Sequence, residues 1–246
     1  MAAPVDPAAP AGSRTVPWIA MYHSVGDCSD DPYRITVTPD RLDRQLTWLG
    51  RRGLRGVSVA DLLAAPDRTD LVGLTFDDGY ADFVTAALPV LRRHGFGATL
   101  FVLPGRLGGD NAWDPLGPRK PLLTADGIRE AARAGVEIGS HGLTHVDLTR
   151  ADDLRLKSEI VESRAVLEEI TGTDVGGFCY PYGTLDQRAV DAVREAGYRY
   201  ACAIDPGPVD SPLALPRVHI GQNDTAVRLF LKHRLHRLRR RPVEGV

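Results

Sequence analysis

Two adjacent carboxylates, Asp77 and Asp78, end the apolar run that begins at Leu71, and Gly79 follows them. The run is short enough for a buried β-strand. In α/β proteins the carboxyl ends of parallel strands often carry reactive side chains, because the strand fixes their geometry while the following loop reaches solvent. The acidic pair is therefore a candidate functional site. Since Asp is also favoured at helix N-caps, capping of a helix that begins near Ala81 is the alternative.

Two histidines, His141 and His145, form the second candidate group. They are spaced H-x3-H and follow the expected strand at 136–140. Gly142 favours a loop, and no glutamate follows His141, so the pattern differs from the HExxH motif of zinc proteases. A loop H-x3-H alone more often binds no metal. With one carboxylate, however, two imidazoles make a three-ligand set that leaves a position open for water, as in catalytic zinc sites.

The acidic pair, Asp77 and Asp78, can supply the carboxylate ligand of this set and leave its second carboxylate free as a base.

Three motifs, in order along the chain, resemble those of the polysaccharide deacetylases of carbohydrate esterase family 4, which share the NodB-homology domain. They are TFDDG at 75–79, SHGLTH at 140–145 and YPYG at 180–183. The resemblance implies a distorted β/α barrel, a divalent metal on Asp78, His141 and His145, and Asp77 as general base.

The chain departs from the family pattern at two positions. Cys179 stands where the third motif usually has an Arg, and Arg217 is a candidate to replace that Arg by orienting Asp77. The late Leu-x-His motif that supplies a general acid has no clean match, and the nearest late residue is His219. The segment MYHSV at 21–25 resembles the N-terminal Tyr-His element of biofilm-type poly-N-acetylglucosamine deacetylases. We therefore take His23 as the general acid and keep His219 as the alternative.

Aromatic residues near the motifs are candidates for stacking on sugar faces. The expected substrate-binding residues are Tyr80, Trp113, Pro181, Tyr182 and Gly183. Trp113 lies in the Gly- and Pro-rich segment 104–121, which we expect to be a long loop that could cover the site. Nothing in the sequence marks Cys179 as an activated nucleophile, so we expect it to be a small buried side chain.

Expected strands and helices alternate at least six times along the chain, which favours a parallel sheet with helices outside it. Because candidate site residues follow several different strands, a barrel fits better than an open sheet. We predict an α/β fold, a distorted (β/α) barrel of seven or eight parallel strands in a single domain. The expected elements include helices at 82–94 and 151–171 and a last strand at 213–220.

Length and composition bound the remaining possibilities. We expect a disordered tail at 1–15, a deacetylase-like domain at 16–224, and a basic helix and tail at 225–246. A net charge of -2 gives no indication of nucleic-acid binding. The first fifteen residues lack the basic start and apolar core of a secretory signal, and no apolar run approaches the roughly 20 residues that cross a bilayer. These features predict a soluble cytoplasmic protein.

The C-terminal segment combines leucines at helical spacing with dense positive charge. Leu231, Leu235 and Leu238 recur among six basic residues, namely Lys232, Arg234, Arg237, Arg239, Arg240 and Arg241. Such a pattern predicts a basic amphipathic helix. Either its leucines pack on the barrel and its basic residues are solvated, or the helix associates weakly with anionic membranes.

The residues and the resemblance together predict a metal-dependent hydrolase that removes an N-acetyl group from an amino sugar in a polysaccharide, oligosaccharide or glycoconjugate. Zinc is the expected metal, with cobalt, nickel, manganese and iron left open. One alternative is a deacylase of an O-ester, another acyl-sugar or a cyclic amide, because a fold does not fix a substrate. The other alternative is a sugar-binding domain without catalysis, although such a domain has no need of a spare carboxylate beside a metal.

Overall fold

A curved parallel sheet forms the centre of the molecule. The computed structural model describes residues 17–204 and 211–236. The strands of this sheet are β1 (Ile19–Tyr22), β4 (Arg55–Val57), β5 (Leu71–Phe76), β6 (Thr99–Val102), β7 (Glu137–Ser140), β8 (Gly177–Cys179), β9 (Tyr200–Ala203), β10 (Leu215–Pro216) and β11 (Val218–His219). Their order is β10-β9-β8-β7-β6-β5-β1-β11, and β4 also pairs with β5. All of these pairs are parallel.

The segment 215–219 closes the sheet into a barrel. Its first half, β10, pairs with β9, and its second half, β11, pairs with β1 at the other edge. The single last strand expected at 213–220 is therefore wrong in detail, because the chain changes partner at Arg217. Pro216, the last residue paired with β9, has no N–H to donate to that ladder. Counted as one crossing strand, β10 and β11 give the barrel eight strands, which confirms the predicted fold class.

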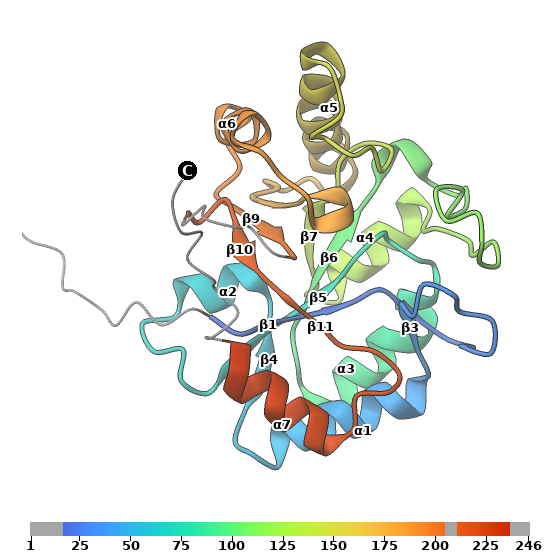
Figure 1. Ribbon diagram of the computed structural model, residues 1–246, viewed down its shortest axis with the longest axis vertical. Coiled ribbons are helices and arrows are strands. Elements are labelled where there is room, and N and C mark those ends of the chain that lie inside the picture. Colours follow the sequence, from blue (N-terminus) through green and yellow to red (C-terminus); the bar gives the residue numbers. More distant parts are fainter. Residues whose placement is uncertain (1–16, 205–210, 237–246) are drawn as a thin grey trace, which may run out of the picture.

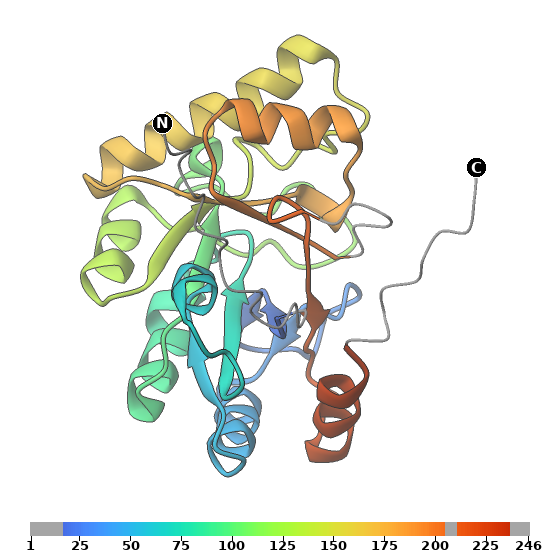
Figure 2. The same ribbon diagram turned by 90° about the vertical axis from the view of Figure 1, so that its left-hand side faces the viewer.

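Seven α-helices lie outside the barrel among the described residues (Figures 1 and 2). They are α1 (Pro39–Gly50), α2 (Val59–Ala64), α3 (Leu88–His94), α4 (Ala125–Arg133), α5 (Asp153–Thr171), α6 (Gln187–Glu195) and α7 (Ala226–Leu235). Five of them begin at a side chain that accepts a backbone N–H, namely Thr38, Ser58, Thr124, Asp152 and Asp186. The helix expected at 82–94 differs at its start, where a π-helical turn at Phe83–Ala87 precedes α3.

The buried apolar residues form two groups on the two sides of the sheet. The larger group packs the helices on the sheet, with Leu42, Leu46, Leu74 and Leu100 among its members. The smaller group contains Ile19, Phe101, Tyr200, Cys202 and Leu215 from the strands. Since successive side chains of a strand face opposite sides, this division indicates a filled barrel interior rather than an open channel.

The tail expected at 1–15 and residues 237–246, including Leu238, lie outside the described residues. Among the residues described, no helix combines the length and the apolar character needed to span a membrane. The expected cytoplasmic location stays a prediction.

Candidate active site

Two buried imidazoles face one oxygen of a buried carboxylate at the carboxyl end of the barrel. Asp78 follows β5, and His141 and His145 lie in the loop after β7. The Oδ1 atom of Asp78 lies 3.3 Å from His141 Nε2 and 3.4 Å from His145 Nε2. It has no hydrogen-bond partner among the described residues. A buried carboxylate oxygen without a donor, faced by two imidazole nitrogens, is the arrangement expected of ligands that share a cation.

The backbone conformation directs two of these side chains into the site. Asp78 and His145 have positive φ angles of 70° and 68°, which are uncommon for residues other than glycine. Such conformations have an energetic cost and persist only where surrounding structure holds them. The loop from His141 to His145 is held by Glu159 of α5, whose buried carboxylate accepts the backbone N–H groups of Leu143 and Thr144.

A backbone contact also fixes the orientation of His141. Its Nδ1 lies 2.9 Å from the carbonyl oxygen of Cys179, so Nδ1 carries a proton and Nε2 is the ring nitrogen that faces the site. Metal-binding histidines commonly make such a second contact. The donor set of Asp78, His141 and His145 therefore fits a divalent cation and leaves room for further ligands.

Electrostatic effects favour the ionised state of Asp78. Burial alone would raise the pKa of this carboxyl, but its close contacts with the imidazoles of His141 and His145 outweigh burial and hold its pKa well below the usual value. Burial lowers the pKa of His145, which favours the neutral imidazole that a metal requires. The pKa of His141 is raised instead, because Cys179 and Asp78 outweigh its burial. A cation at this site would take the place of a proton on His141 Nε2, while Nδ1 would keep its proton on the Cys179 carbonyl oxygen.

Asp77 is held apart from this ligand set by a buried arginine. Arg217 Nη1 donates to Asp77 Oδ1 at 2.6 Å, and Nη2 donates to Oδ2 at 2.7 Å. Burial alone would raise the pKa of Asp77, but the charge and hydrogen bonds of Arg217 outweigh it, so the pKa lies below the usual value. Arg217 stands between β10 and β11, so the segment that closes the barrel also holds Asp77.

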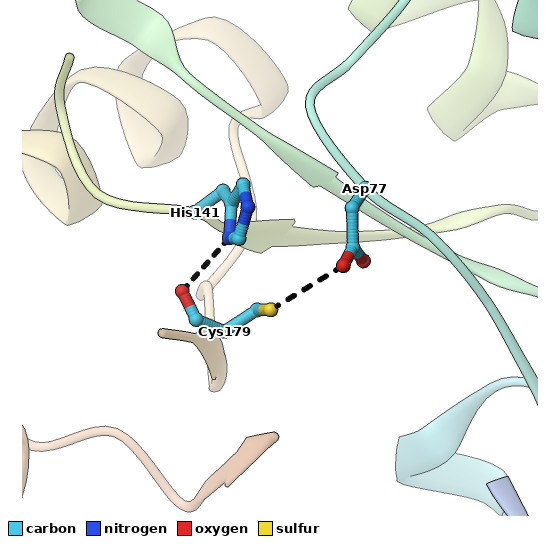
Figure 3. A group of neighbouring side chains, drawn as sticks. All are labelled: Asp77, His141 and Cys179. Atoms are coloured by element: carbon cyan, nitrogen blue, oxygen red, sulfur yellow. Dashed lines mark hydrogen bonds between the residues drawn. The ribbon is translucent and has the colours of Figure 1, made fainter. Parts of the chain in front are cut away.

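Cys179, which stands where the family motif usually has an arginine, is buried beside Asp77 and Arg217. Figure 3 shows its carbonyl oxygen next to His141 and its thiol pointing toward Asp77, with the Sγ atom 3.7 Å from Asp77 Oδ2. Sγ also lies 3.0 Å from Arg217 Nη2. Burial raises the pKa of this thiol, which favours the thiol over a thiolate nucleophile at neutral pH.

Asp77, His141 and Cys179 are themselves close enough to form a ligand group. Asp77 already gives both oxygens to Arg217, and Cys179 is held as a thiol. The group of Asp78, His141 and His145 is therefore the better metal site.

Two histidines were candidates for the general acid, and the structure places them differently. His23, which follows β1, has its Nε2 3.8 Å from Asp77 Oδ2 and lines the same pocket as the ligand set. The ring of His219 lies 6.2 Å from that of His23 and lines a separate cavity with Arg34 and Arg228. Burial lowers the pKa of His219 to about 4, so this imidazole is neutral at neutral pH.

The carboxylates and imidazoles open onto one pocket of about 180 Å³. Trp113, Tyr182 and Gly183, three of the expected substrate-binding residues, line it. Tyr80 does not line it, because its side chain is only 1% exposed and its backbone pairs with Leu122. The expectation that Tyr80 stacks on a sugar is therefore wrong. Pro181 is also buried and lies outside the pocket lining.

Aromatic rings cover both sides of the ligand His145. The Trp113 ring stacks on it at a centroid distance of 4.6 Å, and the Tyr182 ring meets it edge-on at 4.5 Å. Trp113 comes from the segment 104–121, which is a long loop as predicted. Lys120 joins this loop to a separate two-stranded sheet, formed by β2 (Ser24–Val25) and β3 (Thr36–Val37), by donating to the hydroxyls of Ser24 and Thr36.

Sequence patterns did not indicate the roles of two residues of the site, Glu159 and Asp114. Glu159 holds the histidine loop, although on α5 it is one acidic residue among several. Asp114 lines the pocket, and its carboxylate makes no hydrogen bond or ion pair within the described residues. Burial, followed by the charge of Asp78, raises the pKa of Asp114 to about 6. In the sequence, its position directly after Trp113 is the feature that could have indicated a place in the pocket.

Comparison with known proteins assigns the chain to a family. The family profile described as polysaccharide deacetylase matches residues 64–201, more than half of the chain. YxkH of Bacillus subtilis is 25% identical over 206 residues, which cover 82% of this chain and 69% of YxkH. The poly-β-1,6-N-acetyl-D-glucosamine N-deacetylase of Escherichia coli K12 is also 25% identical. That match covers 82% of this chain but only 36% of the enzyme.

A solved structure shows the same fold. The Streptococcus pyogenes deacetylase PplD in complex with acetate superposes with a TM-score of 0.74 at 24% identity, covering 88% of this chain and 96% of PplD. At this identity the likeness concerns the fold. The chain therefore belongs to the polysaccharide deacetylase family, the hydrolases of carbohydrate esterase family 4 that act on N-acetyl amide bonds.

Proposed function

We propose that this protein is a metal-dependent N-deacetylase of an N-acetylated amino sugar within an oligosaccharide, polysaccharide or glycoconjugate. The observation that carries the proposal is the buried Asp78 oxygen, faced by His141 and His145 beside a second, separately held carboxylate, Asp77. Two imidazoles and one carboxylate favour zinc, although cobalt, nickel, manganese and iron also accept these ligands. Names of relatives that include poly-N-acetylglucosamine deacetylases support the substrate class.

The division of labour between the two acids follows from their contacts. A divalent cation held by Asp78, His141 and His145 would polarise the acetyl carbonyl and lower the pKa of water toward about 7. Asp77 would take the proton of the attacking water. The ionised state held by Arg217 keeps Asp77 ready to accept, and the paired contact fixes its direction.

The amide substrate also needs an acid, because an amine leaves poorly as an anion. His23 lines the pocket beside Asp77, so it can give a proton to the leaving nitrogen. Tyr182 and Trp113 present aromatic surface at the pocket, where a sugar ring would stack. Backbone N–H groups near Tyr182 would supply donors to the oxyanion.

Asp114 would hold the sugar through its hydroxyl groups. Its carboxylate lines the pocket without a protein partner, and a hydrogen bond to a charged group contributes about 1.5–3 kcal/mol. Asp114→Asn is therefore expected to lower kcat/KM about 10- to 100-fold, mainly through KM. Steady-state kinetics on an N-acetylglucosamine oligomer measures this effect, with Asp110→Asn in the same loop as the matched control. A fall in kcat with KM unchanged would contradict a role in ground-state binding.

Acetate release tests the proposed reaction directly. The protein should release acetate from N-acetylglucosamine oligomers, lose this activity after treatment with a chelator, and regain it with zinc or another divalent cation. Parallel assays on an O-acetylated sugar separate N-deacetylation from ester hydrolysis. Activity that chelation leaves unchanged would exclude the metal-dependent reaction, and binding of the oligomer without turnover at any metal would indicate a binding domain.

A further inference from the structure

One face of α7 carries apolar side chains that nothing in the described structure covers. Val227, Leu231 and Leu235 are 69%, 48% and 45% exposed. They are four residues apart, so they span an arc of only about 80° on the helix. An outer helix of a barrel normally has polar side chains on its solvent side. These three residues, with the half-exposed Phe230 at one edge, are called the α7 face below.

The helix does not need this face to pack on the barrel. Leu229, on the opposite side of α7, is buried, and the ring of His233 contacts Trp18 at a centroid distance of 4.6 Å. Lys232 donates to Asp224 and to the carbonyl of His219. The sequence left open whether Leu231 and Leu235 pack on the barrel. In the structure, both lie outside the contact between α7 and the barrel.

Basic side chains surround the α7 face. The guanidinium groups of Arg234 and Arg52 lie 5.4 Å and 5.8 Å from the ring of Phe230, and Arg228 lies one residue beyond Val227. The sequence 225–243 contains seven Lys and Arg residues and no Asp or Glu. The rest of the chain then has 23 basic against 32 acidic residues, so the positive charge is concentrated at this end of an otherwise acidic protein.

We propose that the α7 face docks the protein on an anionic lipid bilayer. An apolar stripe bordered by Arg and Lys matches the boundary between acyl chains and anionic headgroups. Each basic residue near such a surface adds attraction, and the apolar side chains enter the interface. The acidic remainder of the protein would be repelled, which gives the bound molecule one orientation. This inference does not depend on the proposed reaction.

Vesicle flotation with the full-length protein tests the proposal. The protein should float with vesicles of phosphatidylglycerol and phosphatidylcholine in equal parts but not with phosphatidylcholine alone. Binding should weaken between about 0.1 M and about 1 M salt, because the Debye length falls from about 10 Å to about 3 Å. Equal binding to both kinds of vesicle, or to neither, would overturn the proposal.

Two variants separate the apolar and the charged contributions. Leu231→Gln with Leu235→Gln should lower the partition coefficient on anionic vesicles about tenfold or more, because the inserted side chains become polar. Arg228→Gln with Arg234→Gln should bind less at low salt and show a weaker salt dependence. All four substituted positions are exposed, so the thermal unfolding temperature should change little.

The matched control uses exposed apolar residues elsewhere. Leu154 and Val161 lie on α5, on the opposite side of the molecule from α7 (Figures 1 and 2). Leu154→Gln with Val161→Gln should bind vesicles like the unaltered protein. Loss of binding in this control as large as in the α7 variant would overturn the proposal. So would a dimer in light scattering that the Leu231 and Leu235 changes convert to a monomer without affecting lipid binding.

Discussion

Asp77→Asn is expected to lower kcat on an N-acetylated oligosaccharide by about 10³-fold while the protein keeps its metal. The amide of Asn cannot take a proton from water at neutral pH, so the general base is lost. The metal stays because both oxygens of Asp77 face Arg217, whereas Asp78 faces His141 and His145. Kinetics of acetate release and elemental analysis of the purified variant measure the two quantities separately.

Asp78→Ala is the matched comparison, since it removes the neighbouring carboxylate of the same strand end. Metal affinity should fall by more than the roughly 100-fold that changes around a metal site can cause, because a ligand itself is lost. Activity should then fall with metal content. If Asp77→Asn lost its metal as completely as Asp78→Ala, the assignment of base and ligand to the two acids would be wrong.

A stability effect accompanies Asp77→Asn and has to be measured beside its activity. Arg217 is buried, and without an ionised partner its charge is uncompensated. Breaking a buried ion pair in this way typically costs about 3–5 kcal/mol of unfolding free energy. Thermal unfolding should therefore shift downward. Assays are run below the new transition, and retained metal shows that the site is still folded.

The candidate ligands Asp78 and His141 could be located from the sequence because each lies at the end of a short apolar run. Such runs mark buried strands, and parallel strands in a barrel end at the same side. Asp78 and His141 were therefore expected to meet although they are far apart in sequence, and the structure brings them within 3.3 Å. The β/α barrel followed from the same alternation of strands and helices.

The contact between Arg217 and Asp77 could not be predicted from sequence patterns. Its contact with Asp77 depends on the register of two short strands, β10 and β11, and on the change of partner between them. Hydrophobic periodicity carries no information on such a change, so the sequence indicated one continuous strand. The suggestion that Arg217 orients Asp77 came from the family resemblance, because the expected arginine is absent at Cys179.

The position of Tyr80 could not be predicted from the sequence for a different reason. It follows the acidic pair directly, so a place in the pocket was a natural expectation. Asp78 and Gly79 both adopt positive φ angles of 70°, and this turn carries the chain toward Leu122, where Tyr80 is buried. Positive φ at a non-glycine residue cannot be foreseen from residue type.

His23→Gln is expected to lower the rate of N-deacetylation by about 10²- to 10⁴-fold, the usual contribution of a general acid. The effect should depend on the leaving group. An aryl acetate releases a phenolate that needs no protonation, so its hydrolysis by the variant should stay within a few-fold of the unaltered rate. The two substrates therefore distinguish proton donation by His23 from a contribution to the shape of the pocket.

His219→Gln is the matched control, since it replaces the neighbouring imidazole. Its ring lies 6.2 Å from that of His23 but lines a different cavity, and burial keeps it neutral by lowering its pKa to about 4. A neutral imidazole outside the pocket cannot protonate the leaving nitrogen. Both activities of His219→Gln should therefore stay near those of the unaltered protein. Equal losses on amide and aryl ester in His23→Gln would assign His23 a structural role, and a selective loss of amide hydrolysis in His219→Gln would identify that residue as the acid instead.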